Sequence, residues 1–173
     1  ASDVYKRQGP VHVELRLNNN GIFPIDIAAR SIGGLCGRTL SFGVGMSLEE
    51  LILRHATGGP IESLDRADQS AGVMMIPIPA GGTLQAVDGL ERARPLPGID
   101  NITIAIPNGH EIVPLPEGSE YLGFIFARAG DPAVVEQTLR AAHAQLHFEI
   151  STSATASTVA AAAAPSEKLV DPA

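Results

Sequence analysis

The chain has 173 residues, which is enough for one domain of ordinary size and marginal for two. Hydrophobic residues make up 45% and charged residues 18%, so the chain can build a core and is not a disordered polyelectrolyte. The formal net charge of -7 argues against nucleic-acid binding, and a single cysteine excludes an internal disulfide framework. No apolar run reaches the roughly 18 residues of a membrane span, and no secretory signal pattern begins the chain. We therefore expect a cytoplasmic α+β protein that binds neither nucleic acid nor membranes.

The two ends of the chain carry no sign of a fold. Residues 1–8 lack periodicity and read as a non-native, adaptor-like leader. Residues 151–173 are rich in Ala, Ser and Thr, which predicts a disordered tail. The folded part then divides into residues 9–60 and a strand-rich subdomain of residues 61–150, because the sequence turns polar near Gly58–Ala71.

The first block begins with a predicted hairpin. Val11–Leu17 alternates apolar and polar residues, which is typical of a strand with one buried face. Three Asn residues and a Gly follow it and predict a turn, since Asn and Gly tolerate positive φ. Ile22–Ala29 reads as the second strand, and Pro24 predicts an edge or a bulge there because proline cannot donate to a strand ladder.

Helices and further strands follow the hairpin. A short helix is expected over Leu35–Phe42, and a capping box that starts at Ser47 predicts a helix to about His55. Asp131 followed by Pro132 predicts the N-terminus of a helix that ends near Leu146. The remaining expected elements are strands at Val73–Ile78, Gly82–Val87, Ile102–Ile106, Tyr121–Ala127 and His147–Ile150, with a short helix at Leu90–Leu96.

Two acidic residues of the hairpin form the first candidate site. If the loop is Asn19–Gly21, Glu14 lies directly opposite Asp26 on the same face. Opposed side chains have Cβ atoms about 4.5–5.5 Å apart, so the two carboxylates repel unless a divalent cation neutralises them. The alternative is that both acids are solvated residues of an exposed face, with Arg16 as a surface partner.

A second candidate is the segment after the hairpin. Arg30 supplies a guanidinium that suits phosphate or carboxylate, and Gly33 and Gly34 precede a predicted helix whose free N–H groups favour an anion. The alternative is that the glycines only permit a tight turn and that Arg30 pairs with a surface acid.

These motifs together resemble the end of the ATP-grasp domain in carboxylate–amine ligases. The resemblance is carried by H-V-E, the hairpin turn and P-I-D-I-A-A-R-S-I-G-G-L, and then by F-G-V-G-M-S-L-E-E-L-I-L-R-H-A-T-G, G-L-E-R-A-R-P-L-P-G-I and Y-L-G-F-I-F-A-R-A-G. It extends from about Gly9 to Ile150 and is nearest to the branch that contains L-amino acid ligases. It implies an α+β fold in which the C-terminal part of an ATP-grasp domain, with antiparallel strands and packed helices, precedes a small strand-rich subdomain.

The resemblance also implies a reaction and a set of site residues. ATP would phosphorylate a carboxylate, and an amine would then attack the acyl phosphate to form an amide. Glu14 and Asp26 match the metal-holding acids, with Mg²⁺ or Mn²⁺ as the metal, and Arg30 matches the catalytic arginine; Gly33 and Gly34 would complete the ATP-binding set. The implied partners are ATP and a small carboxylate–amine pair, and a homodimer is one expected assembly.

Two departures from the family pattern bear on these expectations. Asp26 is one methylene shorter than the usual Glu, and Ala28 stands where many members have a metal-binding Asn. The nucleotide-clamping loop and lysines of the family have no counterpart in this sequence, so we expect the chain to be inactive alone. The alternatives are a non-catalytic α+β binding or oligomerisation module on the same scaffold, and a relative of biotin carboxylase or carbamoyl-phosphate synthase that uses bicarbonate.

Overall fold

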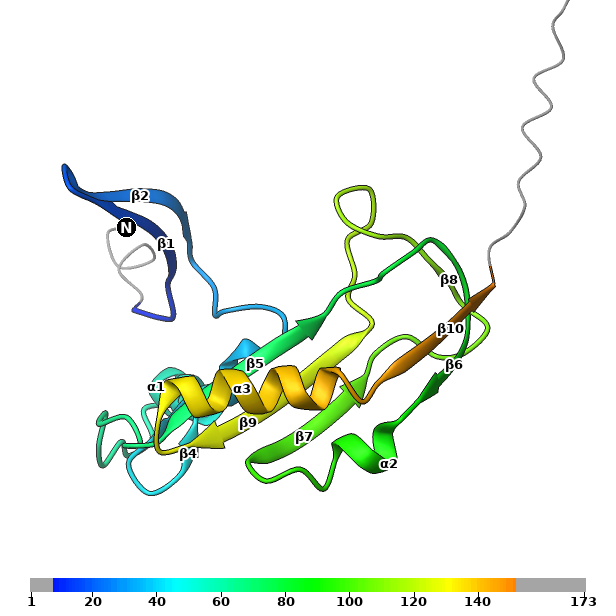
Figure 1. Ribbon diagram of the computed structural model, residues 1–173. Coiled ribbons are helices and arrows are strands. Elements are labelled where there is room, and N and C mark those ends of the chain that lie inside the picture. The colour runs from blue at the N-terminus through cyan, green and yellow to red at the C-terminus, as the bar shows by residue number, and fades with distance from the viewer. Residues whose placement is uncertain (1–7, 152–173) are drawn as a thin grey trace, which may run out of the picture.

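The computed structural model describes residues 8–151, and the expectations for residues 1–7 and 152–173 lie outside this part of the chain. It is a mixed α+β fold with antiparallel sheets, as predicted (Figure 1). The strands are β1 His12–Asn18, β2 Gly21–Ala28, β3 Ser41–Phe42, β4 Met46–Ser47, β5 Ser70–Ile76, β6 Gly82–Asp88, β7 Ile99–Ile104, β8 Glu111–Ile112, β9 Gly123–Ala129 and β10 His147–Ser151. The helices are η1 Cys36–Thr39, α1 Leu48–Thr57, α2 Leu90–Ala93 and α3 Pro132–His143.

Two three-stranded sheets form the body of the molecule, one in the order β5-β9-β7 and the other in the order β10-β6-β8. The central strand β9 is apolar over most of its length because both of its edges are paired and both of its faces are covered. Ile125, which is fully buried, pairs with Met74 of β5 and Ile102 of β7. The core continues into the second sheet through the fully buried Leu84 of β6.

Helix α3 covers the β5-β9-β7 sheet. It begins at Asp131, whose carboxylate accepts a hydrogen bond of 2.7 Å from the Ala133 amide, as the sequence predicts. Its apolar stripe of Val135, Leu139 and Ala142 is buried against the sheet. Below this stripe lies Gly72 of β5, where an added Cβ would be 2.7 Å from Cγ1 of Val135, so only glycine fits without repacking.

The predicted capping box is also present. The Ser47 hydroxyl accepts a hydrogen bond of 3.1 Å from the Glu50 amide and starts α1, which ends at Gly58 in the left-handed region. None of the α1 residues is buried within the described chain. Among residues 8–151, no helix combines the length and the apolar character needed to cross a bilayer.

The prediction of a helix over Leu35–Phe42 is wrong. The structure has only the four-residue 3₁₀ helix η1 there, followed by β3. Leu35 adopts the left-handed conformation at φ 57°, which breaks helical geometry, and Gly37 weakens helix propensity inside the segment.

The predicted strands are confirmed, with ends that differ by up to three residues. Ser151, which the sequence assigns to the tail, is the last residue of β10.

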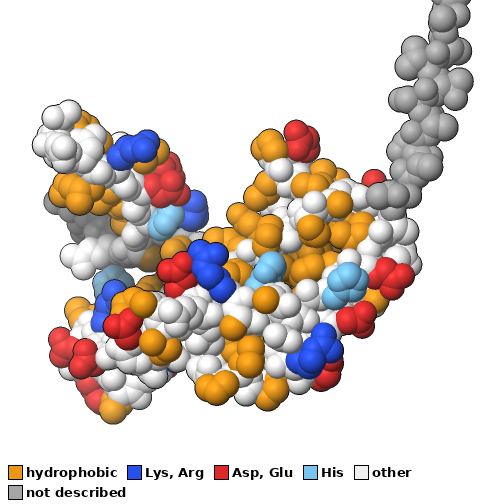
Figure 2. Space-filling model, viewed as in Figure 1, with side chains coloured by type: hydrophobic (Ala, Val, Ile, Leu, Met, Phe, Trp, Pro, Cys, Tyr) orange, Lys and Arg blue, Asp and Glu red, His pale blue; other side chains and the backbone are white. Residues whose placement is uncertain are grey.

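The β1–β2 hairpin stands apart from the two sheets, to which residues 29–35 join it (Figure 1). Its apolar side chains remain exposed, with exposed fractions of 55% for Leu15, 76% for Leu17 and 64% for Ile27. Hydrophobic side chains also lie exposed on the adjoining part of the body (Figure 2). A two-stranded hairpin with an open apolar face has marginal stability in water.

Candidate functional site

Glu14 and Asp26 are paired directly across the hairpin, as the sequence predicts. Paired residues share one face of a sheet, and their Cβ atoms are about 4.5–5.5 Å apart. Two neighbouring pairs complete this face: His12 lies opposite Ala28 on one side of the acids, and Arg16 lies opposite Phe23 on the other.

The pairing arises by a different route from the one predicted. The turn contains two residues, since Asn18 pairs with Gly21, and the Asn18 side chain accepts a hydrogen bond of 2.8 Å from the Asn20 amide. A bulge then follows between Glu14 and Leu15: Leu15 pairs with Pro24, and Ile25 is left without a partner. The shorter turn and the extra residue offset each other, so Asp26 is opposite Glu14.

The carboxylates of this pair are available to a cation. Both side chains are exposed, and the four ion pairs found within residues 8–151 include neither of them. Arg16, the expected surface partner, bridges neither acid. The donor set is therefore two hard oxygen ligands without a protein cation, which fits Mg²⁺ or Mn²⁺.

The pair is not a complete metal centre by itself. No group of three or more His, Cys, Asp or Glu side chains in the described part of the chain is arranged to hold a metal ion. Additional ligands would have to come from solvent, from substrate phosphates or from a side chain that turns toward the pair.

Arg30, Gly33 and Gly34 lie between the hairpin and η1. Arg30 is exposed and donates to the Ser31 carbonyl at 3.1 Å, and no hydrogen bond or ion pair of the described residues joins it to the acidic pair. Gly34 faces the body, where an added Cβ would be 3.6 Å from the sulfur of Met75. Because η1 has only four residues, the helix dipole that the sequence predicts at this point is not available for an anion.

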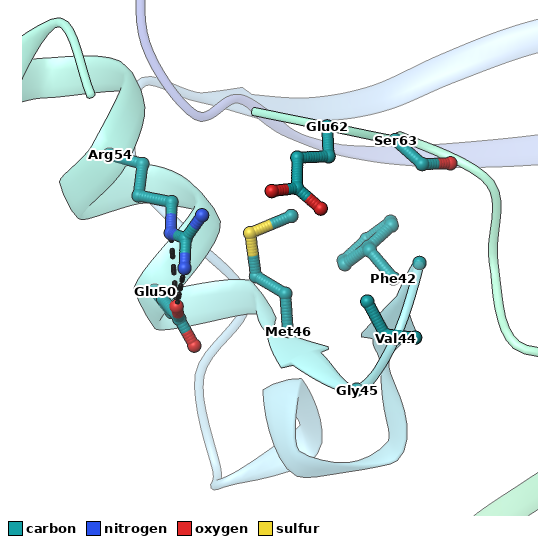
Figure 3. Close-up of a pocket in the computed structure, with 9 residues that line it drawn as sticks. Phe42, Val44, Gly45, Met46, Glu50, Arg54, Glu62 and Ser63 are labelled. Atoms are coloured by element: carbon teal, nitrogen blue, oxygen red, sulfur yellow. Dashed lines mark hydrogen bonds and ion pairs between the residues drawn. The ribbon is translucent and has the colours of Figure 1, made fainter. Parts of the chain in front are cut away.

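A surface cavity that sequence reasoning missed lies between the β3–β4 turn, α1 and residues 62–63 (Figure 3). Its volume is about 440 Å³. Glu50 binds Arg54 at its edge, and the Arg54 side chain also donates to the Pro60 carbonyl at 2.9 Å. Glu62 points into the space between Met46 and Phe42. These residues come from three separate segments, and no spacing in the sequence indicates that they meet.

The second half of the chain matches a known protein family. Residues 74–151, from β5 to β10, match the family described as L-amino acid ligase C-terminal domain 2. The solved L-amino acid ligase of Bacillus licheniformis is 26% identical and superposes with a TM-score of 0.68. That similarity covers 86% of this chain and 38% of the ligase.

More distant structures share the fold. Phosphoribosylglycinamide synthetase from Anaerococcus prevotii is 14% identical, with a TM-score of 0.66, over 82% of this chain and 37% of its own. N5-carboxyaminoimidazole ribonucleotide synthetase from Thermotoga maritima is 18% identical, with a TM-score of 0.58, and the similarity covers 82% of this chain and 37% of that protein. The uncharacterized protein y4rH of Sinorhizobium fredii is 22% identical over 83% of this chain and 30% of its own length. The chain thus spans less than two fifths of these proteins.

Proposed function

We propose that this chain is the C-terminal part of an ATP-grasp ligase and that its hairpin holds the magnesium ion of a carboxylate–amine ligase. The observation that carries this proposal is the direct pairing of Glu14 with Asp26, on one face and without a protein cation. The substrate class that we propose is amino acids, in line with the L-amino acid ligase that this chain resembles.

In this function Glu14 and Asp26 each supply carboxylate oxygens to the cation. A bound Mg²⁺ neutralises charge on the phosphate oxygens of ATP during phosphoryl transfer. The acceptor carboxylate would attack the γ-phosphorus of ATP, so that ADP leaves and an acyl phosphate forms. Attack by an amine then releases phosphate and forms the amide, with no covalent intermediate on the protein.

Arg30 is proposed to bind an anionic oxygen of the phosphoryl group or of the substrate carboxylate. Its guanidinium makes one hydrogen bond, to Ser31, within the described residues, so several N–H groups are free. It follows β2 by two residues, which puts it at the end of the strand that carries Asp26. The backbone N–H groups of Gly33 and Gly34 remain candidates for the same anion, as parts of a turn and not of a helix N-terminus.

The reaction needs more protein than this chain, since the ligase it resembles is more than twice as long. We propose that the exposed apolar face of the hairpin, opposite the acidic pair, is covered by another part of the natural protein. Burial of that face would fix the hairpin and hold both carboxylates in place.

The test is ATP-dependent phosphate release by the natural protein that contains this chain. With Mg²⁺ and pairs of amino acids, we expect release that requires both amino acids, and a dipeptide product by mass spectrometry. Glu14→Gln and Asp26→Asn should each reduce the rate by about 100-fold or more, because electrostatic stabilisation of a transition state is commonly of this size. Glu117→Gln removes a carboxylate that is also exposed, from a loop outside the hairpin, and serves as the matched control.

Three results would contradict the proposal. Unchanged release in Glu14→Gln and Asp26→Asn would remove the acidic pair from the mechanism. Stimulation by bicarbonate instead of an amine would indicate a carboxylating relative. An absence of release with every amino-acid pair, in a protein that folds and binds ATP, would favour a non-catalytic module.

A further inference from the structure

The cavity between the β3–β4 turn, α1 and residues 62–63 lies outside the hairpin, and the proposed function gives it no role (Figure 3). Its volume of about 440 Å³ is within the range of sites that hold small molecules. Apolar side chains of the turn form one part of its wall, and charged side chains of α1 and the later loop form another. The charges and their partners therefore decide which class of ligand the cavity can accept.

Hydrogen bonds between separate parts of the chain hold the wall of the cavity in place. On one side, the Gly43 amide of the turn donates to the Asp65 carbonyl at 2.8 Å. On the other side, the Arg54 guanidinium of α1 donates to the Pro60 carbonyl at 2.9 Å. The loop is thus anchored both before and after Glu62, so the cavity exists before any ligand binds.

Glu62 is the one charged side chain of this wall without an ion-pair partner in the described part of the chain. Glu50 and Arg54 form an ion pair with each other, and the Ser63 hydroxyl donates to the Asp65 carboxylate at 2.9 Å. The wall therefore carries two carboxylates and one guanidinium, which leaves one net negative charge. Such a wall attracts a cation and repels a carboxylate or a phosphate.

The surroundings of Glu62 favour an organic cation. Its side chain points into the space between Met46 and Phe42 (Figure 3). An aromatic ring such as that of Phe42 attracts a cation, and a thioether makes favourable contacts with an alkyl chain. Val44, at the tip of the turn, is fully exposed with a fraction of 100%, and a ligand that covers it removes apolar surface from water. A hydrated metal ion would gain from none of these apolar contacts.

We propose that this cavity binds a small alkylammonium compound, with its ammonium group on Glu62 and its alkyl chain against Phe42 and Met46. An ammonium group is compact, carries three N–H donors and needs only one carboxylate as its charged partner. The proposal is independent of the acidic pair, because no residue that lines the cavity belongs to the hairpin.

Three probes of equal chain length and different charge test the proposal. Hexylammonium, hexanol and hexanoate are each titrated into the full 173-residue chain, and the Met46 methyl and Phe42 ring signals are followed by NMR. We expect hexylammonium to shift both signals at millimolar concentration, as befits a ligand of this size. Hexanol should bind about fivefold more weakly, and hexanoate should leave both signals unchanged.

Variants separate the contribution of the charge from that of the apolar wall. Glu62→Gln keeps the size of the side chain and should lower the affinity for hexylammonium about fivefold, to that of hexanol. Glu49→Gln removes an exposed carboxylate of α1 that does not line the cavity, and this matched control should leave the affinity unchanged. Phe42→Leu should lower the affinity for hexylammonium by about twofold to fivefold and change that for hexanol much less.

Three outcomes would overturn the proposal. The first is that hexylammonium shifts neither Met46 nor Phe42. The second is an equal response to hexylammonium and hexanoate, which would mean that the surface is apolar and does not select charge. The third is an unchanged affinity in Glu62→Gln. Because none of these measurements involves ATP or the hairpin, they leave the proposed function of the acidic pair to its own test.

Discussion

Neutralising one acid of the hairpin should stabilise the hairpin without metal and remove its response to metal. Glu14 and Asp26 are directly paired, so their charges are about 5 Å apart, and two unit charges at that distance in water repel by about 0.8 kcal/mol. Asp26→Asn removes this repulsion. The free energy of opening the hairpin should rise by about that amount at low ionic strength, which corresponds to roughly fourfold slower amide exchange.

The measurement must be local, because the hairpin packs against no other strand or helix to any large extent. Hydrogen exchange of the β1 and β2 amides, followed by NMR, reports on the hairpin itself, whereas a thermal melt reports on the body. Adding Mg²⁺ to ten times its dissociation constant should stabilise the wild-type hairpin by about 1.4 kcal/mol, and Asp26→Asn should show little of this effect. Arg16→Gln is the control for the direction of the effect. It removes a positive charge from the face that carries the two acids, so amide exchange in the hairpin should become faster.

Two results would refute this reasoning. Equal exchange rates in the wild type and Asp26→Asn would mean that the two carboxylates do not repel and are not held together in solution. An equal Mg²⁺ response in both proteins would mean that the cation binds elsewhere.

Three further predictions concern the fold. Gly72→Val should lower the free energy of unfolding by about 1–3 kcal/mol in urea denaturation, because its Cβ meets α3, and Val135→Ala in the same chain should recover part of that loss. Ile125→Ala should lower the same quantity by about 2–5 kcal/mol, since Ile125 is fully buried in the central strand. Ser47→Ala should destabilise α1 by about 1 kcal/mol through the lost cap, which amide exchange in α1 would detect; unchanged exchange would contradict the capping role.

The elements that sequence predicted correctly are those with local signals. Strand alternation, the Ser47 cap and the Asp131 cap each depend on residues close together in the chain, and the structure confirms them. The two-residue strands β3, β4 and β8 are too short for any periodicity. The cavity beside Glu62 was not predictable, because it forms only when the β3–β4 turn, α1 and a later loop are brought together.

The hairpin shows which sequence signal fixed the register of the acidic pair. The turn was predicted with three residues and has two, yet Glu14 still meets Asp26. With a two-residue turn and no bulge, Glu14 would pair with Ile25, and Asp26 would pair with Val13 on the apolar face. Pro24 cannot donate to the ladder at this point, so a bulge there has a low cost and restores the separation of polar and apolar faces. The alternation of side chains over both strands therefore determines the pairing, and the turn and the bulge adjust to it.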